Sequence, residues 1–221
     1  MDNLDYKELY ALQDKVLDTI FSIEKEFYLT GGTCLSRFYH EKRYSDDLDF
    51  FTHNSGRFSF AVKNIKVKLQ QNHQLDTEVD SRNFIRLKVD KLLQIDFVND
   101  TAYRYKDPVI KDNGYIIDTV ENILSNKITT VIGRDNPKDI FDIYLICKFY
   151  KFNWNDILKA AQKKASFAHE DLIIRLKSFP AILLDSIRII DKSFLENFDI
   201  EFPVIIKEID TKSMHVLQNP K

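Results

Sequence analysis

The chain has 221 residues, 44% of them hydrophobic, and a formal net charge of −2 at pH 7. A chain of this length buries roughly 72% of its unfolded surface on folding, which supports a core and one to one and a half domains. The charge argues against a protein that coats nucleic acid by bulk electrostatics. No apolar run is long enough to cross a membrane, and two distant cysteines provide neither a zinc motif nor a disulfide framework.

The first half of the chain predicts helices mixed with strands. Apolar residues at three- and four-residue spacing, from Leu9 to Ile23, predict a helix over about residues 5–25. A strand at 27–30 leads into a glycine turn and a short helix that ends near Tyr39. The remaining elements of this half are a strand at about 48–52, a helix at 60–69, strands at 84–89 and 92–98, and a short strand at 115–117.

The second half predicts helices alone. From about Thr119 the pattern is helical to the end, with interruptions at Pro137, Pro180 and Pro203 and a short loose tail. No Gly/Ser-rich linker separates the halves. The order of elements therefore predicts an α+β protein, with a core domain at residues 1–118 and a helical region at 119–221 that helps to complete the active site.

A glycine pair and two aspartates form the main chemical motif. Gly31 and Gly32 let the backbone approach phosphate oxygens, and the N-terminus of the following helix offers unpaired N–H groups to them. Asp47 and Asp49 are two residues apart on an apolar strand, so they project from the same face. Such hard oxygen ligands suit Mg²⁺ that is shared with substrate phosphates, although a single pair of this kind is about as often a solvated strand face.

A third carboxylate, Asp96, lies on the second of two successive strands, opposite the apolar face of that strand. Next to the aspartate strand, two carboxylates about 5 Å apart would repel by roughly 3 kcal/mol at an effective dielectric near 20. Such a cluster needs a cation or a proton. Asp90 and Lys91 predict a tight turn before this strand, and the length of the turn decides whether Ile85 or Arg86 faces Asp96.

Lys127 falls within the apolar stripe of the helix predicted from Thr119 to about Ile132. A lysine in this position must extend to the surface or reach a buried anion, and on pattern alone the first is the commoner case. Asp139 and Asp142 lie three residues apart and share one face of the next helix. Asp139 also follows Pro137 closely and suits the positive end of a helix dipole.

Four stretches of the chain, in this order, resemble one family. They are Gly31 to Phe51, Gln94 to Asp100, Asn122 to Lys127 and Lys138 to Asp142. Together they are similar to the DNA polymerase β-like nucleotidyltransferases and, within these, to the AbiEii/AbiGii toxin family, over about residues 27–150. The chain departs from many relatives at Lys42, where a histidine is common, but this position is outside the expected metal ligands.

The resemblance implies a mixed β-sheet flanked by helices, followed by a helical bundle. It implies transfer of a nucleoside monophosphate from an NTP to an acceptor hydroxyl, with release of pyrophosphate. Asp47, Asp49 and Asp96 would bind two Mg²⁺ or Mn²⁺ ions roughly 3.5–4 Å apart, and Asp96 would help to deprotonate the acceptor. The residues expected to hold the nucleotide and its phosphates are Gly31, Gly32, Thr33, Arg43, Ser45 and Lys127, with Asp139 orienting Lys127 or a substrate group.

Some roles remain open at this stage. The alternatives are that Arg43 is a surface arginine, that Ser45 is a turn serine and that Thr33 is a helix cap. Relatives act as toxins, some of them on tRNA, which implies a tRNA acceptor and an antitoxin partner. Transfer to a small molecule or protein is an alternative, and so is NTP binding without turnover, which the presence of all three aspartates argues against. The N-terminus lacks the basic and apolar regions of a secretion signal, so the cytoplasm is expected.

Overall fold

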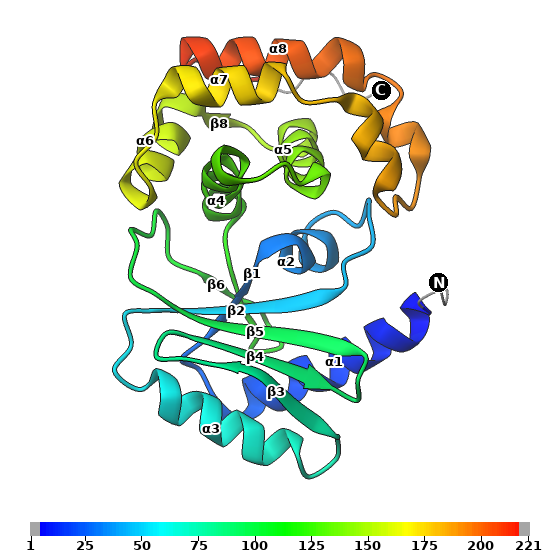
Figure 1. Ribbon diagram of the computed structural model, residues 1–221, viewed down its shortest axis with the longest axis vertical. Helices are drawn as coiled ribbons and strands as arrows, with labels where there is room; N and C mark the ends of the chain where they lie inside the picture. The colour runs from blue at the N-terminus through cyan, green and yellow to red at the C-terminus, as the bar shows by residue number, and fades with distance from the viewer. Residues whose placement is uncertain (1–4, 217–221) are drawn as a thin grey trace. The chain divides into compact units, whose positions relative to one another are not determined.

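A computed structural model of the protein describes residues 5–216 (Figure 1). The loose C-terminal tail and most of the N-terminal segment considered for a secretion signal lie outside this range. The chain divides into two compact units. The first contains the residues up to Phe38, Tyr44–Thr101 and Pro108–Asp118, and the second contains Tyr39–Arg43, Ala102–Asp107 and the residues from Thr119 onward. The second unit thus takes in two short segments from the range assigned above to the core domain.

The first unit is a mixed sheet with three helices. Its strands lie in the order β3-β4-β5-β2-β1-β7-β6. The β2–β5 and β1–β7 pairs are parallel, whereas β1–β2, β3–β4, β4–β5 and β6–β7 are antiparallel. The elements are α1 (Tyr6–Ile23), β1 (Tyr28–Thr30), α2 (Gly31–Phe38), β2 (Asp47–His53), α3 (Phe58–Leu69), β3 (Leu75–Asp80), β4 (Phe84–Val89), β5 (Leu93–Asp100), β6 (Val109–Ile110) and β7 (Ile116–Ile117).

Aromatic packing covers one face of this sheet. Phe50 of β2 and Phe97 of β5 stack with their ring centroids 5.4 Å apart. Phe21 of α1 packs edge-on against Phe50, while Phe27 contacts both Phe97 and Phe58 of α3. Alternation along each strand therefore directs the apolar residues toward α1 and α3, and leaves the opposite face to the polar residues of β2 and β5.

The connection between β4 and β5 has one residue more than the expected two-residue turn. Val89 pairs with Leu93, so Asp90, Lys91 and Leu92 form the loop, and Asp90 and Lys91 have φ of 49° and 57°. This length pairs Arg86, not Ile85, with Asp96. The sequence analysis also missed β3, because its residues are almost all exposed and only pairing with β4 defines it as a strand.

The second unit is helical, apart from a two-stranded sheet of β8 and β9. Thr119 caps α4 by accepting from the backbone N–H of Asn122, and Pro137 occupies the first turn of α5. Pro203 lies inside α8, so its expected interruption is wrong: a helix can continue through the loss of one N–H donor. The elements are α4 (Val120–Gly133), α5 (Pro137–Phe149), β8 (Phe152–Asn153), α6 (Trp154–Lys164), α7 (His169–Lys177), the 3₁₀ helices η1 (Ala181–Ser186) and η2 (Lys192–Leu195), α8 (Phe198–Thr211) and β9 (Met214–His215).

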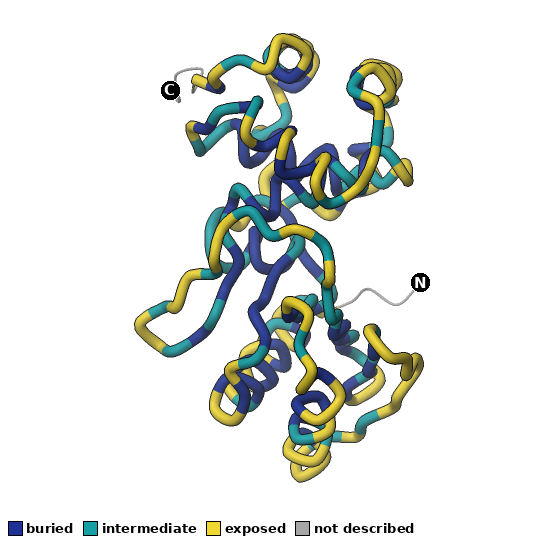
Figure 2. Tube along the Cα trace, turned by 90° about the vertical axis from the view of Figure 1, so that its left-hand side faces the viewer, coloured by how far each residue is buried: buried dark blue, intermediate teal, exposed yellow. Residues whose placement is uncertain are grey.

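Each unit has its own buried interior, drawn dark blue in Figure 2. In the second unit α5 is the most enclosed helix, since its residues from Asp139 to Cys147 are all buried. The expected α+β class, with a mixed sheet, flanking helices and a helical second half, is confirmed. No helix within residues 5–216 combines the length and apolar character that a membrane span requires.

Candidate active site

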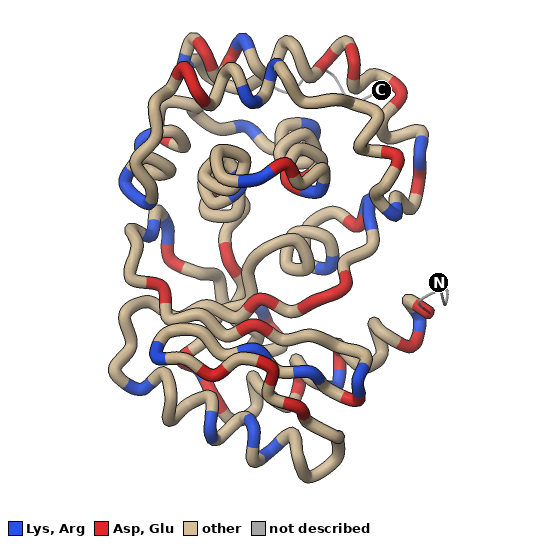
Figure 3. The backbone as a smooth tube through the Cα atoms, in the orientation of Figure 1, with Lys and Arg blue, Asp and Glu red and all other residues tan. Residues whose placement is uncertain are grey.

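The three aspartates lie on two neighbouring strands of the first unit. In the parallel β2–β5 pair, Asp49 is directly opposite Asp96, and Asp47 is opposite Gln94. Directly paired residues project from the same face, so all three carboxylates share one side of the sheet. In Figure 3, acidic positions, drawn red, lie along the strands of the sheet. Asp96 is buried, whereas Asp47 and Asp49 are half-buried.

Gly31 is next to Asp49. Thr30, the residue before it, pairs with Asp49 across the β1–β2 ladder, and Gly31 opens α2 with φ of +73°. An added Cβ at Gly31 would collide with Oδ2 of Asp49. A glycine is therefore required here both for the left-handed backbone and for the space that the carboxylate occupies. Gly32 follows as the second residue of the helix.

Thr33 and Ser45 tie the start of α2 to the start of β2. The Thr33 hydroxyl lies 2.7 Å from Oγ of Ser45 and donates to the carbonyl oxygen of Asp47. The backbone of Ser45 is held in turn by α1, because its N–H donates to the Tyr10 hydroxyl and its carbonyl accepts from Nε2 of Gln13. Both hydroxyls are buried, so they fix the loop that delivers Asp47.

Arg86 forms a bidentate ion pair with the carboxylate of Asp96. Nε of Arg86 donates to Oδ1 and Nη2 donates to Oδ2, each at 2.7 Å. The hydrogen bonds to Asp96 raise the pKa of Arg86, against the opposing effect of burial. Within residues 5–216 no group of three or more His, Cys, Asp or Glu side chains is arranged to hold a metal ion. The carboxylate oxygens on β2 and β5 are the type of ligand that Mg²⁺ prefers. In this structure, however, both oxygens of Asp96 accept hydrogen bonds from Arg86.

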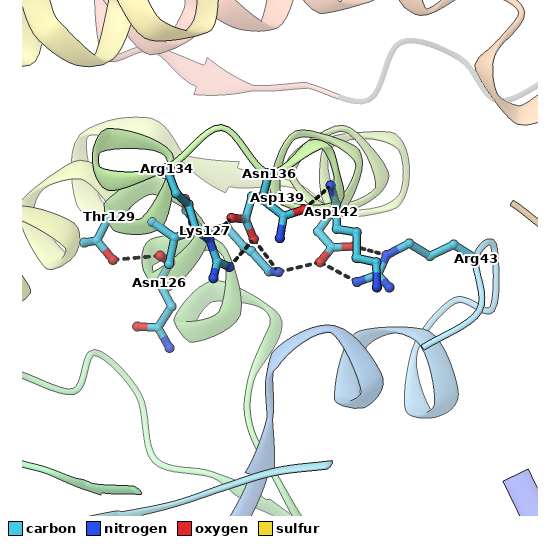
Figure 4. Close-up of polar contacts among 10 residues, drawn as sticks. Arg43, Asn126, Lys127, Thr129, Arg134, Asn136, Asp139 and Asp142 are labelled. Carbon is cyan, nitrogen blue, oxygen red and sulfur yellow. Dashed lines mark hydrogen bonds and ion pairs between the residues drawn. The ribbon is translucent and has the colours of Figure 1, made fainter. Parts of the chain in front are cut away.

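A buried ion network joins α4, α5 and the segment 39–43 in the second unit (Figure 4). Nζ of Lys127 is 2.8 Å from Oδ1 of Asp139 and 2.7 Å from Oδ2 of Asp142. Arg134 donates to both oxygens of Asp139, at 2.7 and 3.0 Å. Arg43 donates to both oxygens of Asp142, at 2.7 and 2.9 Å. Three cations thus share two carboxylates.

Ion pairing in this network outweighs the effect of burial on the pKa of its carboxylates and its lysine. Burial would raise the pKa of Asp142, but Arg43 and Lys127 outweigh it and lower that pKa to about 2. Burial would likewise raise the pKa of Asp139, whereas Lys127 and Arg134 lower it. Burial would lower the pKa of Lys127, and the two carboxylates raise it instead. All these groups are therefore charged near neutral pH.

The structure brings together the expected residues in two sets. Gly31, Gly32, Thr33, Ser45, Asp47, Asp49 and Asp96 belong to the first unit, while Arg43, Lys127 and Asp139 belong to the second. Lys127 reaches buried anions rather than the surface, which overturns the commoner pattern-based alternative. Arg43 is only 2% exposed, so the alternative of a surface arginine is also wrong.

Sequence reasoning left one arginine of these sets undecided and missed another. Arg86 and Ile85 were both possible partners of Asp96, because the pairing depends on the length of the turn. Arg134 was not singled out, although it lies five residues before Asp139 on the chain. The signal available for Arg134 was a basic residue at the C-cap of α4, where it also meets the first turn of α5.

Comparisons with known proteins identify the family of the chain. A family model described as nucleotidyl transferase AbiEii toxin, Type IV TA system, matches residues 16–204. The uncharacterized protein aq_aa25 of Aquifex aeolicus is 26% identical over 182 residues, which cover 78% of this chain and 82% of that protein. The crystal structure of JHP933 from Helicobacter pylori has a TM-score of 0.59 at 21% identity, covering 95% of this chain and 94% of that one.

A toxin structure has the same fold. MenT4, nucleotidyltransferase toxin Rv2826c from Mycobacterium tuberculosis H37Rv, has a TM-score of 0.50 at 12% identity, covering 92% of this chain and 93% of that one. The polymerase β-like fold expected from the motifs is thereby confirmed. The family model spans most of the sequence, including all four motif stretches up to Asp142. The chain therefore belongs to the AbiEii nucleotidyltransferase toxin family.

Proposed function

We propose that the protein transfers a nucleoside monophosphate from an NTP to a hydroxyl group at the end of a tRNA, as the toxin of a toxin–antitoxin pair. The observation that carries this proposal is the register that sets Asp49 opposite Asp96 and beside Gly31, so that carboxylates and a helix N-terminus meet at one place. Membership of a nucleotidyltransferase toxin family supports the reaction class. A cognate antitoxin is the partner that this family membership suggests.

The first unit has the parts that such a reaction needs. The N–H groups at the start of α2, near Gly31 and Gly32, would hold phosphate oxygens, and the positive end of the helix dipole favours the same charge. Asp47 and Asp49 would hold divalent metal, with Asp96 as the third ligand. When bound, Mg²⁺ or Mn²⁺ neutralises phosphate charge and acidifies the acceptor hydroxyl.

The protein's own residues would position the reactants and accept the proton of the acceptor hydroxyl. Thr33 and Ser45 keep the loop before Asp47 fixed through their buried hydroxyls. Asp96 would accept the proton of the acceptor hydroxyl, because it is the carboxylate farthest along the sheet from the glycine turn. Lys127 would donate to triphosphate oxygens, with Asp139 orienting its ammonium group. Positioning of this kind, with charge neutralisation, accounts for most of the rate gain in phosphoryl chemistry.

The test is a label-transfer assay with the full chain. Purified protein is incubated with Mg²⁺, total tRNA and each radiolabelled NTP in turn, beside Asp49→Asn and Asp46→Asn variants. Asp46 is the matched control, because its carboxylate accepts from the Tyr6 hydroxyl and lies outside the proposed ligand set. Label on tRNA with the wild type and Asp46→Asn, but not with Asp49→Asn, supports the proposal.

Other outcomes separate the alternatives. Tight NTP binding without labelled RNA would assign a different acceptor, such as a small molecule or a protein. A protein that neither binds NTP nor transfers label would refute the proposed roles of the glycines and aspartates. Labelled tRNA from Asp49→Asn at the wild-type rate would refute the role of this carboxylate.

A further inference from the structure

Arg86 stands at the end of a row of paired residues that crosses four neighbouring strands. Arg86 on β4 pairs with Asp96 on β5, Asp96 pairs with Asp49 on β2, and Asp49 pairs with Thr30 on β1. Directly paired residues share a face of the sheet, so a single positive side chain lies in line with the proposed metal ligands. The three-residue loop between β4 and β5 creates this arrangement.

The contact between Arg86 and Asp96 is a bidentate pair of charge-assisted hydrogen bonds, which are the strong ones in proteins. Both carboxylate oxygens accept from the guanidinium, each at 2.7 Å, and the Asp96 side chain is only 10% exposed. The guanidinium also lies over the ring of Phe84, 5.4 Å from its centroid, which limits its freedom. A bidentate pair of this kind offsets the charge of the carboxylate and occupies a lone pair on each of its oxygens.

Arg86 has a second acidic neighbour on its other side. The β3–β4 ladder shifts register between Thr77 and Val79, so Glu78 is the extra residue of a bulge beside Arg86. A guanidinium that leaves Asp96 therefore has an acidic residue beside it on the adjacent strand.

We propose that Arg86 is an internal counter-cation for Asp96, so that a divalent cation engages Asp96 only when the guanidinium releases it. This inference rests on the metal-binding role of Asp96 in the proposed function. Arg86 is a positioning residue in this account: it holds Asp96 in place and suppresses its repulsion with Asp49 while no metal is bound. Asp47 and Asp49 take up a cation first, and Asp96 joins when Arg86 turns toward Glu78.

The experiment measures binding of Mn²⁺ alone, without nucleotide, from the electron paramagnetic resonance signal of free Mn²⁺ during titration of the full chain. Arg86→Met removes the charge and keeps much of the side-chain length. Lys88→Met is the matched control, because Lys88 lies on the same face of β4 but pairs with Gln94. Arg86→Lys retains the charge without the two-point contact, and it serves as a second variant if Arg86→Met folds poorly.

An adjacent arginine weakens the binding of a proton to an aspartate by about ten- to a thousandfold. A metal ion that binds the same carboxylate is opposed by the same positive charge. Arg86→Met is therefore expected to bind Mn²⁺ about tenfold more tightly than the wild type, and Arg86→Lys to fall between the two. Lys88→Met should stay within about twofold, since only the long-range charge changes. In an Asp96→Asn background, Arg86→Met should have no effect beyond that of Lys88→Met.

Unchanged or weaker Mn²⁺ binding by Arg86→Met would overturn the inference, because a merely structural role predicts loss of affinity. Tighter binding that persists in the Asp96→Asn background would also overturn it. Failure of the wild type to show any Asp47-dependent Mn²⁺ binding would refute the metal site of the proposed function, and this inference with it. The inference stands if Mn²⁺ binding changes as expected while label transfer to tRNA fails.

Discussion

Replacement of Asp142 by asparagine should destabilise the second unit more than any single change at an exposed carboxylate. The side chain of Asp142 is 1% exposed, and its two oxygens accept from Arg43 and contact Lys127. Asparagine preserves the size of the side chain but not its charge. The variant therefore leaves two cations facing a neutral amide inside the helical unit, where water cannot replace the lost partner.

The size of the effect follows from the structure. A pKa lowered to about 2 from 3.8 corresponds to about 2–3 kcal/mol of the free energy of unfolding at neutral pH. Breaking a buried ion pair by removing one partner costs about 3–5 kcal/mol. The folded-state pKa is the lower one, so this stabilisation is complete above about pH 5 and is lost as the pH falls toward 2. About 1 kcal/mol of it is gone by pH 3.

Urea unfolding followed by circular dichroism at pH 7 and pH 3 tests this reasoning. The Asp142→Asn variant should unfold at a lower urea concentration at pH 7, and its stability should fall less than that of the wild type between pH 7 and 3. Asp210→Asn is the control in the same unit: the Asp210 side chain is 51% exposed and 3.6 Å from His169, so its replacement should cost less than about 1 kcal/mol. Equal stability of Asp142→Asn and Asp210→Asn at pH 7 would refute the argument.

Three further predictions follow from single sites. Gly31→Ala should abolish label transfer and lower the free energy of unfolding by about 1–2 kcal/mol, because its φ is +73° and its space is occupied; Gly56→Ala, with no atom within 4 Å of an added Cβ, should leave transfer intact in the same assay. Cys34 and Cys147 should not react with Ellman's reagent in the folded protein, since burial raises the pKa of both thiols, and rapid reaction without unfolding would contradict this. Lys127→Gln should weaken NTP binding about tenfold or more in a fluorescent-nucleotide titration; wild-type affinity with reduced urea stability would limit this lysine to a structural role.

Local patterns in the sequence identified most elements of the fold and the carboxylates of the site. Alternation along β2 places Asp47 and Asp49 on one face whatever lies beside them, because the strand period is two residues. The stripe of α4 is likewise visible as a 3.6-residue period, and its apolar residues Val120, Ile123, Leu124 and Val131 are all buried. The glycine pair, the aspartates and the later helical motifs were enough to indicate the family.

The contacts between distant side chains follow from tertiary packing. Arg86 faces Asp96 because the β4–β5 loop has three residues, and a difference of one residue reverses every side chain of a strand. Arg43 and Asp142 are separated by 99 positions, so no local period could indicate their pairing. Local sequence patterns thus indicate the types of chemical group and the face of the helix or strand on which each lies. The partner of each charge depended on register and on long-range packing, which set the distance between groups that are far apart along the chain.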